Sequence, residues 1–385
     1  MSADPWMEPE ATGLLEAAAP NPPSPGPVES LGIASFGPRW GVAMGTLGCV
    51  LLGGLYAFSQ QLRYGESVTG MGTIGSGGAA WGLYIVFAVF FLGISFAGIS
   101  LRALTHLFRI QAIEPISRIT LAMGIVGLVL GEACVMADLG RPLHGLVNLP
   151  QYANPGSPFF FSFTLAVGGY LCAGGVYLYL EGRRDAAYCR TRVPRFRWLY
   201  DLWSFGYRGT SGEGRRHKAV SFWLAVLVLP LLVVASSTLG FVFGTLGGRP
   251  GWFNDLQAPG FVVMAGVSGI GLLIVVTALV RRFLRLEREI GLPTFRWLGN
   301  ALLVLSGIYL YFMIAEQVTA NYAGVSAEGR ISYETVFGVY AIPFWTTAAC
   351  LTAAFGILFA QFVRSSPSVA WTVSAGVLVN VAGML

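Results

Sequence analysis

Three acidic residues lie within or at the end of long apolar segments of this chain: Glu132, Asp138 and Glu316. An ionised carboxylate is costly in hydrocarbon, so such a group usually faces a protein interior or a cavity, where it can accept protons or bind a ligand. For Glu132 we predict a role in proton transfer or ligand binding, with a buried hydrogen bond between helices as the alternative. Asp138 and Glu316 lie nearer to water, so a solvated or interhelical role is an equal alternative for them.

Helical spacing separates the first two of these carboxyl groups. Six residues correspond to about 9 Å of rise and about 120° of rotation, so Glu132 and Asp138 would not share one face of a helix. They would line two sides of a path, or one of them would be structural.

Two short segments resemble each other: Asp138-Leu139-Gly140-Arg141-Pro142, and Gly247 to Trp252, in which Arg249 also stands between Gly and Pro. Gly followed by Pro commonly ends a helix, which accounts for those two residue types. The arginines need another reason, because a guanidinium group can hold an anionic or carbonyl-bearing head group or an acidic partner surface. Asp255 follows the second segment closely. The repetition also hints at duplicated helical bundles.

Composition defines the elements that must position these residues. The chain is 55% hydrophobic and only 11% charged, against roughly 25% charged residues in soluble domains. A run of about 20 apolar residues crosses the hydrocarbon core, and such runs recur from Trp40 onward. We therefore predict an all-α integral membrane protein with about nine transmembrane helices, more if the chain is truncated, arranged as two four-helix bundles plus peripheral helices. The predicted spans are 40–59, 80–104, 117–138, 159–181, 219–243, 259–281, 297–317, 337–363 and 368–385.

Charge predicts the orientation, because Lys and Arg are retained on the cytoplasmic side. With a cytoplasmic N-terminus, only four of the 24 Lys and Arg residues fall outside: Arg63, Arg141, Arg249 and Arg330. We expect a multi-pass protein of the cell inner membrane, with a disordered Pro-rich cytoplasmic leader at 1–38, a transmembrane domain at 39–385 and a basic cytoplasmic loop at 182–218. Its three acidic candidates then lie near the outer surface. The apolar sequence at Leu385 suggests that the natural chain continues.

Cofactor ligands are scarce in this sequence. The five cysteines are scattered without Cys-x-x-Cys spacing, which argues against an iron-sulfur cluster, a zinc site or disulfides in this chain. The three histidines fall in or beside loops, so we expect neither haem nor a metal site. A secondary transporter is one alternative, since Pro230 and Pro343 could kink helices. The net charge of +5 reflects topology and contact with lipid, not nucleic-acid binding.

Several motifs occur in the order found in a known family. They are Trp81 to Ile85, Gly93 to Gly98, Ala137 to Pro142, Phe241 to Gly244, Arg249 to Trp252, Pro259 to Gly269, Glu316 to Tyr322, Gly338 to Tyr340, and Phe344-Trp345. With these motifs the chain resembles the NrfD-like family, the membrane subunits of polysulfide-reductase-type complexes. The resemblance covers most of residues 80–385.

The resemblance implies a haem-free helical subunit that exchanges electrons between membrane quinone and an iron-sulfur protein on the outer face. Members serve polysulfide, tetrathionate and nitrite reductases, sulfur-metabolism complexes and alternative complex III of respiratory or photosynthetic chains. The implied cofactor is an exchangeable quinone or quinol. The implied partners are a ferredoxin-like subunit on the periplasmic side, molybdopterin or multihaem cytochrome subunits, a second membrane subunit and membrane lipid. The alternative is a membrane anchor without quinone chemistry.

The resemblance also suggests where quinone would bind. It places Asp138 and Arg141 at the quinone pocket, as proton acceptor and as the group that orients the head. Glu132 and Glu316 would form the proton pathway, with Glu132 also a catalytic candidate. The remaining candidates are quinone contacts at Phe96 and Trp252, and partner docking at Arg249 and Asp255.

Two positions depart from the pattern of some relatives. Phe96 stands where alternative complex III subunits carry histidine, and relatives can also carry histidine near Ser236. Neutral imidazole is a natural proton partner for a quinol, so Asp138 or Glu132 would have to serve in its place.

Overall fold

The computed structural model describes residues 37–69, 81–139, 168–192, 197–207, 210–246, 251–322 and 326–384, with six isolated positions between 143 and 156. The chain divides into two units, residues 1–57 and 58–385. In the first unit the structure describes the beginning of helix α3 (Pro38–Tyr64), whose apolar side chains are largely exposed. The second unit contains the end of α3 and all later helices.

The described residues of the second unit form helices joined by turns and short irregular segments, without strands. Its elements after α3 are η1 (Glu66–Thr69), α4 (Leu83–Phe108), η3 (Glu114–Ile116), α5 (Ser117–Asp138), α8 (Gly168–Arg192), α9 (Arg197–Ser204), α10 (Ser211–Gly244), α11 (Gln257–Phe283), α12 (Leu292–Tyr322), α13 (Ser326–Val336), α14 (Ala341–Val363) and α15 (Val369–Met384). Across the part of the chain that the structure describes, seven helices are long and apolar enough to cross a membrane: α3, α4, α5, α10, α11, α12 and α14. Helix α15 is apolar but shorter.

The predicted all-α membrane fold is therefore confirmed, and most helices extend beyond the predicted spans by a few residues. The span predicted at 159–181 falls partly outside the described residues, and its described part belongs to α8. The segment 182–218, expected to be a basic cytoplasmic loop, contains the end of α8, all of α9 and the beginning of α10 where it is described. Its helices are stabilised locally: at the start of α10, Thr210 and Glu213 form a reciprocal capping box.

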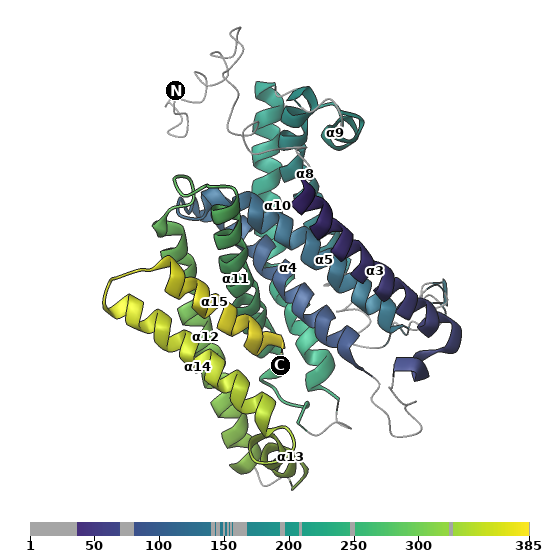
Figure 1. Cartoon of the computed structure of the whole chain (residues 1–385), viewed down its shortest axis with the longest axis vertical. Coiled ribbons are helices and arrows are strands. Elements are labelled where there is room, and N and C mark those ends of the chain that lie inside the picture. The colour runs from purple at the N-terminus through teal and green to yellow at the C-terminus, as the bar shows by residue number, and fades with distance from the viewer. Residues whose placement is uncertain are drawn as a thin grey trace. The chain divides into compact units, whose positions relative to one another are not determined.

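The long helices that follow α3 pack into two bundles, as the sequence suggested (Figure 1). Helices α4, α5, α8 and α10 pack around one buried cluster, which includes Phe96, Tyr177 and Val228. Helices α11, α12, α14 and α15 pack around another, which includes Phe295 and Leu351. Helix α11 contacts both α4 and α10 and so joins the two bundles.

Small residues set the separation of the central helices. A Cβ atom added at Gly269 of α11 would lie 2.1 Å from the Cβ atom of Ala97 on α4. A Cβ atom added at Gly98 of α4 would lie 2.6 Å from the backbone oxygen of Thr120 on α5. Real Cβ atoms do not approach other atoms so closely, so only glycine permits these backbones to pack at this distance. Helix α4 is therefore held tightly on two sides.

An ion pair is buried between α4 and α8, at the end of the helices opposite to Glu316. The Arg102 guanidinium donates through Nε to a Glu181 carboxylate oxygen at 3.0 Å, and its Nη2 contacts the same oxygen. Both side chains are largely buried, at 13% and 8% exposure. A second pair, Arg118 with Asp185, joins α5 to α8 at the surface.

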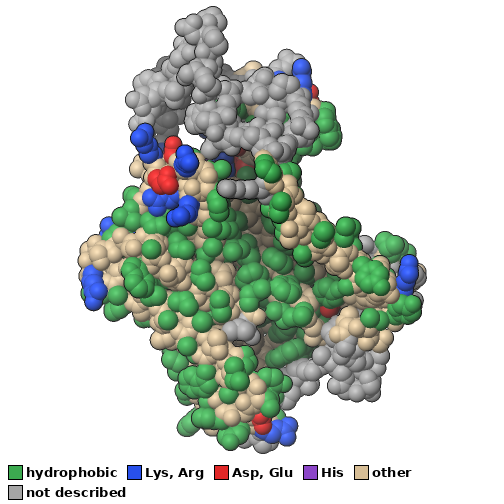
Figure 2. Space-filling model, viewed as in Figure 1, with side chains coloured by type: hydrophobic (Ala, Val, Ile, Leu, Met, Phe, Trp, Pro, Cys, Tyr) green, Lys and Arg blue, Asp and Glu red, His purple; other side chains and the backbone are tan. Residues whose placement is uncertain are grey.

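Charged and apolar side chains are separated on the surface of the molecule. Figure 2 shows hydrophobic side chains covering the middle of the visible face, and Lys and Arg gathered with acidic residues over the connection between α11 and α12. Arg281 and Arg282 lie in the last turn of α11, and the connection itself includes Arg285 and Arg288. This is the distribution expected of a protein whose belt faces lipid.

The close contact between Ala97 and Gly269 predicts what happens when a methyl group is added at position 269 and when the methyl group at position 97 is then removed. Gly269→Ala should lower the free energy of unfolding by about 1–3 kcal/mol, because the added methyl group has no space. Adding Ala97→Gly should restore much of this loss. Thermal unfolding in detergent measures both effects, with Gly356→Ala as control because nothing lies within 4 Å of a Cβ atom there. Equal destabilisation by Gly269→Ala and by the control Gly356→Ala would contradict the packing described.

The buried ion pair generates a second prediction. Glu181→Leu should destabilise the protein by about 3–5 kcal/mol, because it removes the buried partner of the Arg102 charge and leaves only the longer contact of 3.8 Å with the exposed Glu114. Asp185→Leu should cost about 0–1 kcal/mol, since its partner Arg118 is exposed to solvent. The Tm values of the Glu181→Leu and Asp185→Leu variants in the same detergent test this difference. Similar Tm values would show that the ion pair between Arg102 and Glu181 contributes no more to stability than the exposed pair.

Candidate functional site

A cavity of about 360 Å³ lies where the two bundles meet, and we call it the first cavity. Helices α4, α10, α11 and α12 form its walls, and Gly383 of α15 lies at its edge. The walls are mainly apolar. The apolar lining residues include Ile85, Val89, Phe90, Phe96, Leu239, Phe243, Phe261 and Met264.

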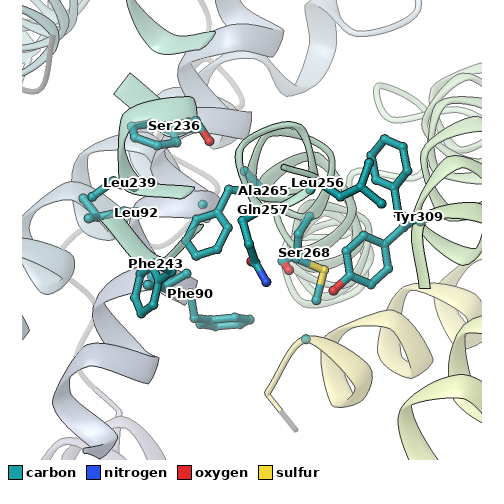
Figure 3. A pocket seen from close by; sticks show the side chains of 18 of the residues that line it. Phe90, Leu92, Ser236, Leu239, Phe243, Leu256, Gln257, Ala265, Ser268 and Tyr309 are labelled. Atoms are coloured by element: carbon teal, nitrogen blue, oxygen red, sulfur yellow. The ribbon is translucent and has the colours of Figure 1, made fainter. Parts of the chain in front are cut away.

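A few polar groups line one part of this apolar cavity. Gln257, Ser268 and Tyr309 project toward its interior from α11 and α12 (Figure 3). Glu316 lines it from α12, seven residues after Tyr309. Seven residues make about two helical turns, so these two side chains stand on one face of α12. A cavity with apolar walls and few convergent polar groups suits a mostly apolar molecule with oxygen atoms at one end.

A second cavity of about 840 Å³ adjoins the first. The segment 251–256 and helices α12, α13, α14 and α15 enclose it. Its lining is more polar than that of the first cavity. The polar lining residues are Asn254, Asp255, Tyr309, Glu316, Gln317, Thr319, Glu328, Ser332, Thr335, Tyr340 and Thr347.

Glu316 lines both cavities, which places its carboxyl group between the mainly apolar first cavity and the larger second cavity, whose lining includes more polar side chains. A side-chain hydrogen bond joins its carboxyl group to Asn254. Asn254 is itself fixed, because its side-chain oxygen accepts a hydrogen bond of 2.9 Å from the backbone N–H of Leu256. The turn before α11 therefore positions the partner of the carboxyl group.

Aromatic rings pack beside the first cavity at the same end of the helices. Trp252 stacks on Trp81, with ring centroids 5.7 Å apart and planes 6° apart. Phe243, which lines the cavity, contacts both tryptophans edge-on and lies 5.2 Å from Phe261 between ring centroids. The rings connect the starts of α4 and α11 to the end of α10. They are also amphipathic anchors typical of a membrane interface.

A polar contact near Asp138 joins three helices. The buried Gln61 side chain, near the end of α3, donates a hydrogen bond of 3.0 Å to the backbone oxygen of Ala137. It also accepts a hydrogen bond of 2.9 Å from the Tyr84 hydroxyl group. Asp138 itself is half-buried where α5 ends. This contact fixes the end of α5 against the beginning of α4.

The structure brings only some of the predicted site residues together. Phe96 and Glu316, 220 positions apart, both line the first cavity, and Trp252 reaches it through Phe243. Asp255 is exposed and lines the second cavity. Asp138 and Glu132 lie on α5, which contributes no residue to either cavity. Arg141 and Arg249 lie outside the described residues.

Other polar residues at the cavity were not singled out from the sequence. Gln257, Ser268 and Tyr309 are common residue types in membrane helices, and nothing in their spacing distinguishes them. The available signal was that Ser268 and Tyr309 lie, like Glu316, in the half of their predicted spans that is nearer to the expected outer surface. Ser236, noted where relatives can carry histidine, is buried and lines the first cavity.

The described residues contain no group of three or more His, Cys, Asp or Glu side chains that could hold a metal ion. The five cysteines are free. The polar side chains that line the two cavities carry carboxyl, hydroxyl and amide groups, all of which can hydrogen-bond a ligand, and the carboxyl groups can also exchange protons.

The fold and the cavities define a multi-pass helical membrane protein with a ligand-sized cavity between two bundles. The family described as polysulphide reductase, NrfD, matches residues 73–385. The chain belongs to this family, which confirms the resemblance found in the sequence.

Three curated proteins are similar to this chain. A protein described as a dimethyl sulfoxide reductase membrane subunit, from Halobacterium salinarum, is 32% identical over 288 residues, which are 74% of this chain and 61% of that protein. A selenate reductase subunit of Mesobacillus selenatarsenatis is 25% identical over 69% of this chain and 63% of its own length. The Hdr-like menaquinol oxidoreductase integral membrane subunit of Archaeoglobus fulgidus is 23% identical over 77% and 66%. The chain thus spans less than two thirds of each relative.

Proposed function

We propose that this chain is the quinol-oxidising membrane subunit of a multi-subunit reductase, and that the first cavity binds the quinone head group. Two observations support this. The relatives are named as subunits of reductases and of a menaquinol oxidoreductase. The cavity volume of about 360 Å³ falls within the roughly 300–1,000 Å³ usual for small-molecule sites.

The lining of the cavity fits the chemistry of such a ligand. A quinol supplies two electrons and two protons when it is oxidised, so its hydroxyl groups need hydrogen-bond partners and a proton acceptor. Tyr309 and Gln257 are placed to hydrogen-bond the ring oxygens, and the Glu316 carboxylate to accept a proton. Phe90 and Phe96 offer aromatic surface to the ring and exclude water from it.

Electrons leave through another subunit in this proposal, since the described residues offer no metal-binding group. We propose an iron-sulfur partner of ferredoxin type, followed by a molybdopterin or multihaem subunit, with a second membrane subunit also present. The partner would dock where Trp252 and Asp255 stand, beside the aromatic rings. This is the outer face if, as we propose from the distribution of Lys and Arg, the N-terminus is cytoplasmic in the inner membrane.

The proton acceptor can be identified by comparing two carboxyl groups. Glu316→Gln should lower the rate of menadiol oxidation by the purified complex by about 100-fold or more. It should leave binding of a quinone analogue nearly unchanged, because the side chain keeps its size. Asp138→Asn is the matched variant on α5 and should have a small effect if the first cavity is the site.

The opposite result would relocate the site. Loss of turnover only in Asp138→Asn would place quinol oxidation at the end of α5, near Arg141, as the sequence first suggested. Loss in both variants would make Asp138, with Glu132, part of the proton pathway. Unchanged turnover in both would contradict the proposed role of either carboxyl group.

Filling the cavity tests binding directly. Gly260 lines the first cavity, and nothing lies within 4 Å of a Cβ atom added there. Gly260→Leu should therefore fold normally while weakening the binding of a quinone analogue by about tenfold or more, as measured by titration of the purified complex. Gly356→Leu on α14 is the control, because Gly356 lines neither cavity. Absence of saturable binding in the unsubstituted complex would favour the alternative of an anchor without quinone chemistry.

A further inference from the structure

We infer that the second cavity is a water-filled vestibule that carries protons between Glu316 and the aqueous phase. This inference rests on the proposed function and adds the route by which the site exchanges its protons. It begins from the position of Glu316, which lines both the first cavity and the second cavity, where more polar side chains are gathered. A carboxyl group at such a boundary can receive a proton on one side and release it on the other.

The size and lining of the second cavity suit water. At about 30 Å³ per molecule, its volume of about 840 Å³ has room for on the order of 25 water molecules. Polar cavities hold water because each molecule finds several hydrogen-bond partners, whereas apolar cavities stay dry. Carboxyl groups of Asp255 and Glu328 line the same cavity, and Asp255 is exposed to solvent.

A hydrogen-bonded group of side chains fixes one wall of the vestibule. The Ser332 hydroxyl of α13 donates to the side-chain oxygen of Gln317 on α12 at 2.7 Å. The Asn321 amide donates to the same Ser332 hydroxyl oxygen at 2.7 Å. Ser332 is buried, so these bonds hold α13 in place against α12. The wall is thereby built from polar groups at defined positions next to Glu316.

The proton balance of each step is simple. An O–H bond of the bound quinol breaks, its proton moves to the Glu316 carboxylate, and an electron leaves toward the iron-sulfur partner. Glu316 then releases the proton to water in the vestibule and becomes a carboxylate again. Two such steps complete the oxidation of one quinol.

Water access can be measured without turnover by labelling introduced cysteines. Met313 and Ile314 are adjacent on α12, but Met313 lines the cavities while Ile314 is 64% exposed at the lipid-facing surface. In a full chain whose native cysteines are replaced by alanine, a charged, membrane-impermeant methanethiosulfonate should label Met313→Cys about tenfold faster than Ile314→Cys, since the thiolate needs aqueous contact. Equal labelling at the two positions would overturn the vestibule.

A blocking substitution assigns the route. Ala320 lines only the second cavity, whereas Val318 of the same helix is 60% exposed. Ala320→Phe should slow both the labelling of Met313→Cys and menadiol oxidation by the complex, each about tenfold, with unchanged affinity for a quinone analogue. Val318→Phe should change none of these.

The outcomes separate the two proposals. Normal quinone binding with turnover unaffected by Ala320→Phe would overturn the vestibule and leave the proposed function intact. Labelling of Met313→Cys that Ala320→Phe does not slow would show that water arrives through the first cavity, and would also overturn the vestibule. Absence of quinone binding, with labelling as expected, would contradict only the proposed function.

Discussion

The contact between α4 and α11 is the constraint on which the site depends. Ala97 meets Gly269 at a distance that no larger side chain allows, and Gly93 meets Ala265 one turn earlier on α4. The lining of the first cavity ends at Phe96 on α4 and Ser268 on α11, so the close contact forms its inner end. Without this contact, the position of one bundle against the other would not be fixed, and neither would the depth of the first cavity.

Polar side chains are distributed unevenly along the boundary between the two bundles. Towards the end of the helices that carries Trp81 and Trp252, the first cavity meets Glu316, Asn254 and the polar second cavity. Towards the other end, the buried charges are paired, as Arg102 and Glu181 show. A buried charge without a partner is costly, so each buried charged group needs one. The two ends of the protein supply this partner differently. The acidic group near the cavities keeps a hydrogen-bond partner and neighbouring water-accessible space, whereas the opposite end uses an ion pair.

The sequence predicted the helices well because the signal is physical and local. A run of some 20 apolar residues is long enough to cross hydrocarbon wherever it stands, and the predicted span 117–138 coincides with α5. Family membership was predicted from the order of motifs. The helices within the segment 182–218 were not predicted, because its many charged residues interrupt the apolar pattern. Arg183 fixes α9 there through hydrogen bonds to the backbone oxygens of Ser204 and Phe205.

The location of the cavities could not be predicted in the same way. Spans that are apolar on every face give no periodicity to show which face meets a neighbour. Phe96 and Glu316 were both named as candidates, but only the packing of α4, α11 and α12 brings them to one cavity. Asp138 and Glu132 were the leading candidates in the sequence, and the structure places them on a helix that lines neither cavity.

The length of helix α10 determines where its first turns lie. Its 34 residues span about 51 Å, whereas the hydrocarbon core is about 30 Å thick. The polar first turns, which include Arg215, Arg216 and Lys218, must therefore project beyond the lipid as a continuous rigid rod. Charges on a rigid helix keep their spacing. The helix therefore loses little conformational entropy when these charges bind a phospholipid head group or another polypeptide.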